Sequence, residues 1–323
     1  MNNQTILDIL TQTSEYVSGQ ALAGTLGVSR QAVWKGIRAL REQGYAIESV
    51  PNRGYRLRMM PDCLNAAAVR SFVAAAVIGC ELEVLESVGS TNDYLKALAA
   101  KGAKSGAVVA AREQVSGKGR LGRTWQSKKD ENIAFSVLLR PHIAPTEVAC
   151  VTPLTGLAVC KALRAFTGLD CQIKWPNDVI AGRKKLCGIL TEMSAEFDAV
   201  EYIIIGIGIN VNQTDFPTEI AEKATSLLLE TGTRFDKNKL LACILQQMEE
   251  EFLRNNLELT PQALGEYTSL CATVGREVGF SRGGKPCTGT AEGVAPTGAL
   301  LVRLPDGAVA AVSSGEVTAQ GIY

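Results

Sequence analysis

The sequence of 323 residues has one histidine, His142, and none of its nine cysteines belongs to a Cys-x-x-Cys pair. A metal cage built from histidines is therefore excluded, a zinc site of paired thiolates is not indicated, and no metal ligands are predicted. The scattered cysteines lie mostly in apolar stretches, which is typical of reduced thiols in a cytoplasmic protein. His142 lies between Pro141 and Pro145 in an apparent loop, so we expect a surface position rather than a catalytic role.

The chain also lacks an excess of either charge, with 33 Lys and Arg residues against 33 Asp and Glu residues. A uniformly basic surface is thereby excluded, so any contact with nucleic acid must be local. The amino terminus, MNNQTILDIL, lacks the basic start and apolar run of a signal peptide. No apolar stretch approaches the roughly 20 residues of a membrane helix. We therefore expect a cytoplasmic protein without membrane contact.

Local charge asymmetry marks the first part of the chain. Residues 1–29 contain no Lys or Arg, whereas residues 30–58 contain seven against two Glu. Ser18 and Ser29 are placed to cap two helices that Gly27 separates. Residues 45–50 and 55–58 then alternate like two strands around a turn. This is the spacing of a winged helix-turn-helix.

The compact basic excess on the second helix and the wing predicts contact with DNA phosphates. A small helical domain with a solvated basic face is the alternative, and it stays open. The residues predicted to face DNA are Ser29, Arg30, Gln31, Trp34, Lys35, Arg38, Arg53 and Arg56.

Three domains are predicted, giving an α/β (α+β) fold: residues 1–61, 62–270 and 271–323. Pro61 ends the first domain because proline stops a strand ladder and restricts the residue before it. In the second domain apolar strands alternate with helices, which predicts a mixed sheet. The expected strands are 107–111, 132–139, 172–175, 186–192 and 202–210, and the expected helices are 92–100, 153–166 and 237–253. Short alternations and glycines in the third domain predict a small antiparallel β-barrel.

Two glycine-bearing segments in the central domain suggest a ligand site. Gly117–Arg123 combines three glycines with three cations, and this predicts a mobile loop that brings N–H groups and positive charge to a phosphate. Alone, the run is equally typical of a solvated loop. Gly206-Ile207-Gly208-Ile209-Asn210 lacks the third glycine of a dinucleotide fingerprint and reads as a strand. Its glycines favour close passage of the strand beside a ligand.

These segments, together with Ser90-Thr91-Asn92, Lys174-Trp175-Pro176-Asn177-Asp178 and Lys185-Leu186-Cys187-Gly188-Ile189-Leu190, resemble the biotin protein ligases in order and spacing. With a winged helix-turn-helix in front and a small β domain behind, the chain is similar to the bifunctional branch of that family, which also represses the biotin operon. The resemblance implies an SH3-like fold for the last domain. It covers nearly the whole sequence.

The resemblance implies a reaction in two steps. Biotin and ATP give biotinyl-5′-adenylate and pyrophosphate, and a lysine of biotin carboxyl carrier protein then takes the biotinyl group. Biotin, ATP and Mg²⁺ are the implied small molecules, and operator DNA bound by an adenylate-loaded homodimer is the other implied partner. The implied catalytic residues are Arg120, Lys185 and Asp178. Asp178 has two possible roles, holding the acceptor lysine or holding Mg²⁺, and the sequence does not choose between them.

The resemblance also implies two sets of binding residues. Ser90, Thr91, Asn92, Gln114, Gly117, Lys118, Gly119, Arg120, Lys185 and Gly206 correspond to biotin-binding positions. Arg120, Arg123, Trp125, Asn177, Lys185 and Asn210 correspond to positions that bind ATP or the adenylate. Helix capping by Ser90-Thr91-Asn92 and a core position for Trp125 are the alternatives.

The expected chemistry explains why cations are needed. A carboxylate must approach a polyanion, and two unit charges 4 Å apart repel by about 1 kcal/mol in water or about 4 kcal/mol at an intermediate dielectric. Fixed cations offset this repulsion. One position departs from the family, since Lys118 stands where arginine is usual and loses the bidentate fork. A biotin sensor without catalysis and a lipoate-type ligase remain as alternatives.

Overall fold

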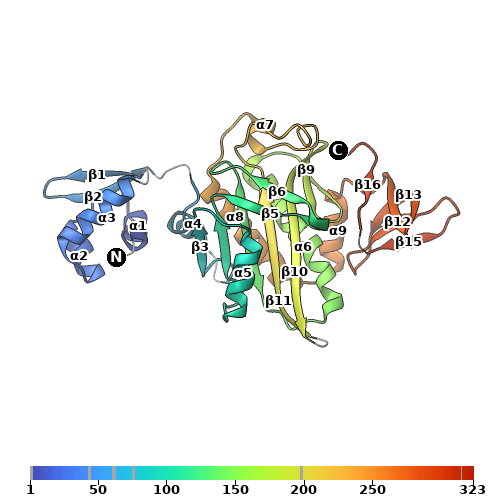
Figure 1. The fold of residues 1–323 in the computed structure, drawn as a ribbon, viewed down its shortest axis with the longest axis horizontal. Coiled ribbons are helices and arrows are strands. Elements are labelled where there is room, and N and C mark those ends of the chain that lie inside the picture. The colour runs from blue at the N-terminus through green and yellow to red at the C-terminus, as the bar shows by residue number, and fades with distance from the viewer. Residues whose placement is uncertain (1–2, 43–44, 60–62, 75–76, 197–198, 314) are drawn as a thin grey trace.

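The computed structural model describes residues 3–42, 45–59, 63–74, 77–196, 199–313 and 315–323. Three units follow one another along the chain, and the amino-terminal and carboxy-terminal units lie on opposite sides of the central one (Figure 1). The predicted boundary at Pro61 lies outside the described residues.

The amino-terminal unit is a winged helix-turn-helix. It contains α1 (Asn3–Thr11), α2 (Gly19–Leu26), α3 (Arg30–Glu42) and an antiparallel hairpin of β1 (Ala46–Val50) and β2 (Gly54–Met59). Ser18 Oγ accepts from the Ala21 N–H and Ser29 Oγ from the Ala32 N–H, as the capping prediction requires. Gly27 ends α2 in the left-handed region, with φ of 63°. The predicted architecture is confirmed.

A mixed sheet of seven strands forms the centre of the molecule. Its order is β3 (Leu82–Leu85), β4 (Val108–Ala111), β7 (Ile133–Leu139), β11 (Ala199–Ile209), β10 (Lys184–Glu196), β9 (Asp178–Ala181) and β8 (Cys171–Lys174). The β3–β4 pair is parallel, and the other neighbours are antiparallel. Each strand predicted from the sequence for this domain corresponds to one of these.

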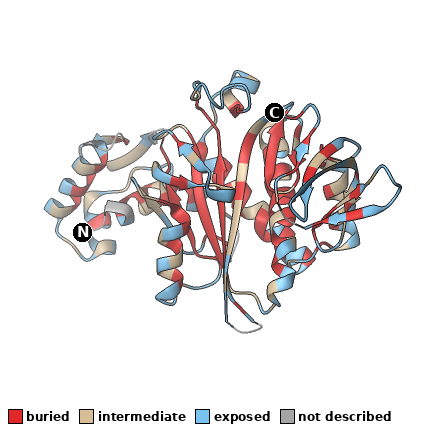
Figure 2. Ribbon diagram, turned by 45° about the vertical axis from the view of Figure 1, so that its right-hand side comes forward, coloured by how far each residue is buried: buried red, intermediate tan, exposed pale blue. Residues whose placement is uncertain are grey.

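Helices cover both faces of this sheet, and alternate residues of one strand show it. Val108 and Ala110 of β4 join the main core with α6 (Val151–Thr167), α8 (Lys237–Asn255) and α9 (Pro261–Leu270). Val109 faces the other way and packs with Leu95 of α5 (Thr91–Ala100). Figure 2 shows the buried strands between exposed outer helix surfaces. Two shorter helices, α4 (Ala66–Phe72) and α7 (Leu227–Thr231), complete the domain.

Helix α6 corrects one expectation from the sequence. The segment Pro145–Thr167, which includes the 3₁₀ turn Pro145–Cys150, has 23 residues and is apolar enough to cross a membrane by length and composition. However, 72% of its most apolar window is buried inside the protein. The expectation that no stretch approaches membrane length was wrong because a helix packed mostly inside the protein is apolar over most of its surface.

The Gly117–Arg123 run is structured more fully than the sequence suggests. Two strands, β5 (Gln114–Lys118) and β6 (Thr124–Ser127), form an antiparallel hairpin joined by a 3₁₀ turn at Arg120–Gly122. A Cβ at Gly117 would lie 2.4 Å from the Trp125 carbonyl oxygen. Glycine at this position therefore lets the two strands approach each other.

The carboxy-terminal unit is an antiparallel sheet in the order β15 (Val309–Val312), β14 (Leu300–Arg303), β13 (Lys285–Val294), β12 (Glu277–Arg282) and β16 (Thr318–Ala319). The antiparallel β prediction for this region is confirmed. All nine cysteines are free thiols, and five of them are buried. His142 is exposed, as expected.

Candidate active site beneath a glycine-rich hairpin

The floor of the site is a strip of sheet without side chains. Gly206 and Gly208 of β11 alternate with Ile207, which joins the core on the other face. Gly188 of β10 is the cross-strand partner of Gly208. Because side chains alternate across a strand, these glycines leave the cavity-facing surface flat and open.

Two side chains lie close on this floor. A Cβ added at Gly206 would lie 2.2 Å from Asn92 Oδ1, and one at Gly208 would lie 2.3 Å from Trp125 Cε2. The Trp125 ring also lies near Gly188, and Lys185 Nζ is 5.7 Å from its centroid. Among the described residues its buried Nε1 has no hydrogen-bond partner. An aromatic ring on a bare glycine surface is suited to stacking with a planar ligand.

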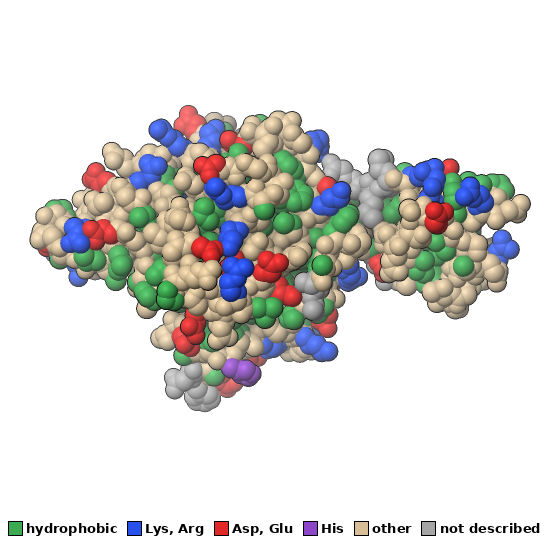
Figure 3. All heavy atoms as spheres, turned by 180° about the vertical axis from the view of Figure 1, so that it is seen from behind, with side chains coloured by type: hydrophobic (Ala, Val, Ile, Leu, Met, Phe, Trp, Pro, Cys, Tyr) green, Lys and Arg blue, Asp and Glu red, His purple; other side chains and the backbone are tan. Residues whose placement is uncertain are grey.

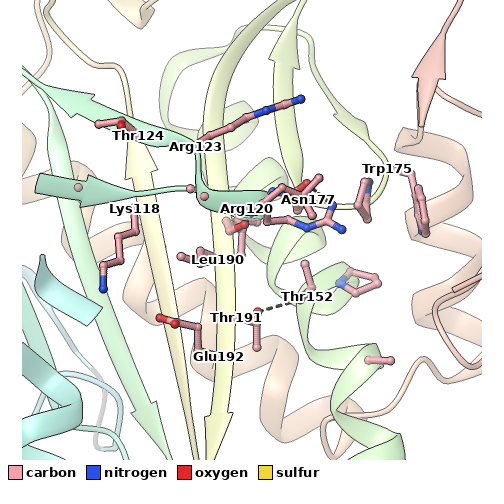
Figure 4. A pocket seen from close by; sticks show the side chains of 18 of the residues that line it. Lys118, Arg120, Arg123, Thr124, Thr152, Trp175, Asn177, Leu190, Thr191 and Glu192 are labelled. Carbon is pink, nitrogen blue, oxygen red and sulfur yellow. Dashed lines mark hydrogen bonds between the residues drawn. The ribbon is translucent and has the colours of Figure 1, made fainter. Parts of the chain in front are cut away.

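The hairpin separates two cavities. The smaller one, of about 50 Å³, lies over the glycine floor, and a larger cleft of about 840 Å³ lies beside it. Both are lined by Lys118, Gly119, Arg120 and Asn177. Figure 4 shows Arg120 reaching across the larger cleft toward Asn177, while Lys118 points away from it.

One end of the small cavity presents a set of polar groups. Gln114 Oε1 accepts from the Thr91 N–H at 2.8 Å and from Thr91 Oγ1 at 3.1 Å. Ser136 Oγ lies 2.6 Å from Asn92 Oδ1, and Asn92 Nδ2 donates to Glu192 at 2.7 Å. Buried polar groups arranged in this way match a small ligand that both donates and accepts hydrogen bonds.

Ser90 belongs to the same end of the cavity. It is buried and begins α5, but its side chain makes no capping hydrogen bond. Helix capping was the alternative explanation for Ser90-Thr91-Asn92, and the geometry at Ser90 does not support it.

Arg120 is the central cation of the site. It is half-buried and donates to two neutral oxygens, Asn177 Oδ1 at 3.0 Å and the Gly315 carbonyl at 3.3 Å. Burial lowers the pKa of its guanidinium while nearby Asp178 raises it, and arginine stays protonated in proteins. Its charge is thus available to an anion in the cleft.

Lys185 and Asp178 form the second charged element. Lys185 Nζ lies 2.6 Å from Asp178 Oδ1, and the register places Asp178 of β9 opposite Gly188. Lys174 lies one strand further, where burial lowers its pKa and Lys185 adds to the effect. Two lysines therefore lie close to the Asp178 carboxylate at one end of the glycine floor.

The other predicted site residues lie at different distances from the cavities. Arg123, which lines the large cleft, pairs with Glu316, and Lys118, which lines both cavities, pairs with Asp93 at 2.6 Å. Asn210 follows β11, is buried, and donates to the Thr225 carbonyl at 2.9 Å. It is not among the residues that line either cavity.

Known protein families match all three units. The biotin/lipoate A/B protein ligase family matches residues 84–210, an HTH domain matches residues 2–56, and the biotin protein ligase C-terminal domain matches residues 273–318. The bifunctional ligase/repressor BirA of Bacillus subtilis is 38% identical over 250 residues, which are 76% of this chain and 77% of that protein. BirA of Escherichia coli is 31% identical over 314 residues, covering 96% and 94%.

The chain belongs to the family of bifunctional biotin ligase/repressors. A solved structure with the same core is the biotin protein ligase from Aquifex aeolicus in complex with biotin and ATP, with a TM-score of 0.64 and 31% identity over 75% of this chain and 99% of that one. The predictions of a biotin ligase domain and of a DNA-binding domain in front of it are confirmed.

The surface predicted to bind DNA in this ligase/repressor lies on α3 and the wing. The predicted residues of α3 and its cap are all exposed, and 50% of the surface of Trp34 is accessible to solvent. Arg53 and Arg56 both lie over the Tyr16 ring, at 4.4 and 4.5 Å from its centroid. In Figure 3, several Lys and Arg side chains are visible on this unit, with a few acidic side chains beside them.

Several residues of the ligase/repressor site were not predicted. Ser136 and Glu192 hold Asn92, and Thr152 bonds Thr191 at 2.8 Å across the large cleft (Figure 4). Tyr323 bonds Asp178. Single polar residues within apolar or mixed strands carry no motif, so only the strand register reveals them.

Proposed function

We propose that the cleft under the hairpin joins biotin to ATP and then transfers the biotinyl group to a lysine of biotin carboxyl carrier protein. The observation that carries this proposal is the half-buried Arg120 beside a bare glycine floor. A carboxylate and a polyphosphate repel each other, and cations held in a partly desolvated site offset that repulsion best at the transition state.

The biotin ring is assigned to the polar end of the small cavity. Ring carbonyl and N–H groups pair there with hydroxyls and amides. The residues proposed for biotin are Ser90, Thr91, Asn92, Gln114, Gly117, Lys118, Gly119, Arg120, Lys185 and Gly206. The hydrogen bonds that join Thr91 to Gln114 and Ser136 to Asn92 support this, because they fix the orientation of the groups before ligand arrives.

The nucleotide is assigned to the cationic end. Trp125 supplies a ring for the adenine, and Arg120 and Lys185 approach the phosphates. The residues proposed for ATP and the adenylate are Arg120, Arg123, Trp125, Asn177, Lys185 and Asn210. Asn210 joins this set only if the segment around Thr225, which now accepts its amide hydrogen bond, rearranges.

Asp178 is assigned to the acceptor lysine. Its ion pair with Lys185 supports this role, because the carboxylate oxygen that lies 2.6 Å from one ammonium group can pair with another. The pairing is electrostatically favourable and leaves the carboxylate able to take the proton of the acceptor amine.

Magnesium is assigned to the nucleotide rather than to the protein. The described residues contain no group of three or more His, Cys, Asp or Glu side chains that could hold a metal ion. Mg²⁺ commonly keeps several waters and binds through substrate phosphates, so the phosphates of ATP can supply most of its ligands. Bound in this way, the ion would neutralise phosphate charge.

The first unit is assigned to operator DNA, with Ser29, Arg30, Gln31, Trp34, Lys35, Arg38, Arg53 and Arg56 as contacts. We also propose that the adenylate-bound protein forms a homodimer in the cytoplasm. Val115 and Leu121 support this, because they are 70% and 69% exposed on the hairpin that the ligand would order. Sedimentation with and without biotin plus ATP tests it, and an unchanged mass together with unchanged operator affinity would contradict it.

The ligase assignment is tested by biotin-dependent exchange of pyrophosphate into ATP, with lipoate in a parallel assay. We expect exchange with biotin and little with lipoate. Equal exchange would assign the site to the lipoate branch, and none with either acid would leave a sensor without catalysis. Asp178→Asn should keep exchange but slow transfer to the carrier by about 10²-fold, the range of a lost general base.

A further inference from the structure

The segment Gly315–Tyr323 of the carboxy-terminal unit borders the catalytic cleft at three points. The Gly315 carbonyl accepts from Arg120, Glu316 pairs with Arg123, and the Tyr323 hydroxyl donates to Asp178 Oδ2. The first two contacts hold the hairpin. The third reaches the carboxylate to which the transfer step is assigned.

Tyr323 is held from several sides. Its backbone N–H donates to the Arg183 carbonyl at 3.1 Å, and Lys174 Nζ lies 3.7 Å from the ring centroid. Ile322 beside it is buried in the main core. Although 36% of the surface of Tyr323 is exposed, burial of its hydroxyl end raises the pKa of Tyr323 well above its ordinary value. The phenol is therefore a protonated donor at neutral pH.

Asp178 thus has an ion-pair contact on one carboxylate oxygen and a hydrogen bond on the other, and among the described residues the buried Oδ1 accepts no hydrogen bond. Lys185 Nζ lies 2.6 Å from Oδ1, and the Tyr323 hydroxyl bonds Oδ2. A bound adenylate would affect Lys185 and Tyr323 differently. A phosphate attracts the charged ammonium of Lys185, whereas the neutral phenol has no such pull.

We propose that Tyr323 is a positioning residue for biotin transfer: its hydroxyl fixes the Asp178 carboxylate so that Oδ1 receives the acceptor lysine once Lys185 has turned to the adenylate. This inference rests on the proposed function of Asp178. The carboxylate of an aspartate side chain rotates over a broad range of its terminal torsion angle. A hydrogen bond to Oδ2 restricts this rotation and so fixes the plane of the carboxylate. Orientation of this kind contributes directly to rate.

The transfer step defines what Asp178 must do. The acceptor ammonium gives up one proton to Asp178, and from there to water, which leaves a neutral amine. The amine nitrogen forms a bond to the biotinyl carbonyl carbon, the bond from that carbon to the phosphate oxygen breaks, and AMP leaves with the electron pair. The nitrogen loses its second proton to water as the amide forms. Adenylation uses none of these transfers.

The test separates the two half-reactions in the full-length protein. Tyr323→Phe keeps the ring beside Lys174 and removes the hydroxyl. We expect it to slow single-turnover transfer from preformed biotinyl adenylate to the carrier by about ten- to a hundredfold, the factor that a hydrogen bond to a charged group supplies. Pyrophosphate exchange should stay unchanged. Hydroxylamine, a nucleophile that is uncharged at neutral pH, should take the biotinyl group at the normal rate.

Three results would overturn the inference. Transfer by Tyr323→Phe at the wild-type rate would show the hydroxyl to be irrelevant. Faster transfer would show instead that the phenol obstructs the acceptor. Equal slowing with the carrier and with hydroxylamine, or a lower melting temperature that accounts for it, would show a structural role. Normal transfer by Asp178→Asn would refute the proposed function itself, whatever Tyr323→Phe does.

Discussion

The two basic regions of this chain differ in how their charges are buried and paired. On α3 and the wing the cations are exposed except Arg56, which is partly buried, and Glu48 accepts hydrogen bonds from Arg56 and Arg58 within the wing itself. In the cleft Arg120 is half-buried and donates to neutral oxygens. Exposed cations are screened by salt and suit a long polyanion, whereas a partly desolvated cation acts strongly on one charge at a fixed place.

The contrast between the two basic regions is tested most directly by removing Arg120, the central cation of the cleft. Arg120→Ala should lower biotin-dependent pyrophosphate exchange by about 10²- to 10³-fold, the usual loss when one preorganised donor to a transition-state charge is removed. Lys104→Ala, which removes an exposed cation from a turn distant from the cleft motifs, is the matched control. Near-normal exchange by Arg120→Ala would show that burial does not distinguish the two regions.

A substitution in the glycine floor tests whether the shape of the cleft matters as well as its charge. Gly208→Ala places a Cβ against the Trp125 ring, and overpacking of this kind costs about 1–3 kcal/mol, which corresponds to roughly a ten- to a hundredfold higher KM for ATP. Operator affinity should change little in the absence of ligands.

A glycine elsewhere supplies the control for that variant. Gly265 lies in α9 with open space around its Cβ position, so Gly265→Ala should stabilise the protein by about 0.5–1 kcal/mol through helix propensity. If both alanine variants leave the KM for ATP unchanged, the floor does not contact the nucleotide.

Much of this arrangement could be predicted from local patterns. The alternation of Gly206 and Gly208 with Ile207 and Ile209 predicts a strand with one bare face, because side chains alternate along any strand. Ser18 and Ser29 likewise predict two helix starts from capping alone.

Other parts depend on long-range register and could not be predicted. Glu192 meets Asn92 because the sheet order brings their strand and helix together, although 100 positions separate them in sequence. Tyr323 meets Asp178 across 145 positions. The hairpin at Gly117 was predicted as a loop because glycine and charge are typical of loops, yet its pairing with Trp125 depends on the backbone approach that the glycine allows.

The smallest expected effect comes from a single substitution in the wing. Glu48 accepts hydrogen bonds from Arg58 and Arg56. Hydrogen bonds with Arg58, then Tyr16, then Arg56 lower its pKa to about 2. Glu48→Gln removes one negative charge and releases both arginines. We expect non-specific DNA affinity at low salt to rise a few-fold and the slope of log affinity against log salt to steepen by about one, as for one further phosphate contact.

The same variant has a pH signature. Because the pKa of Glu48 is lower in the folded protein than its ordinary 4.5, its contribution to stability is present above pH 4.5 and is lost as the pH falls toward 2. Denaturant unfolding should therefore show a small difference between wild type and Glu48→Gln at neutral pH that disappears in acid. Glu15→Gln, which removes an exposed carboxylate from the same unit, should show neither effect. If it matches Glu48→Gln in DNA binding, net charge rather than the pairing in the wing sets the affinity, and the contrast with the cleft rests on burial alone.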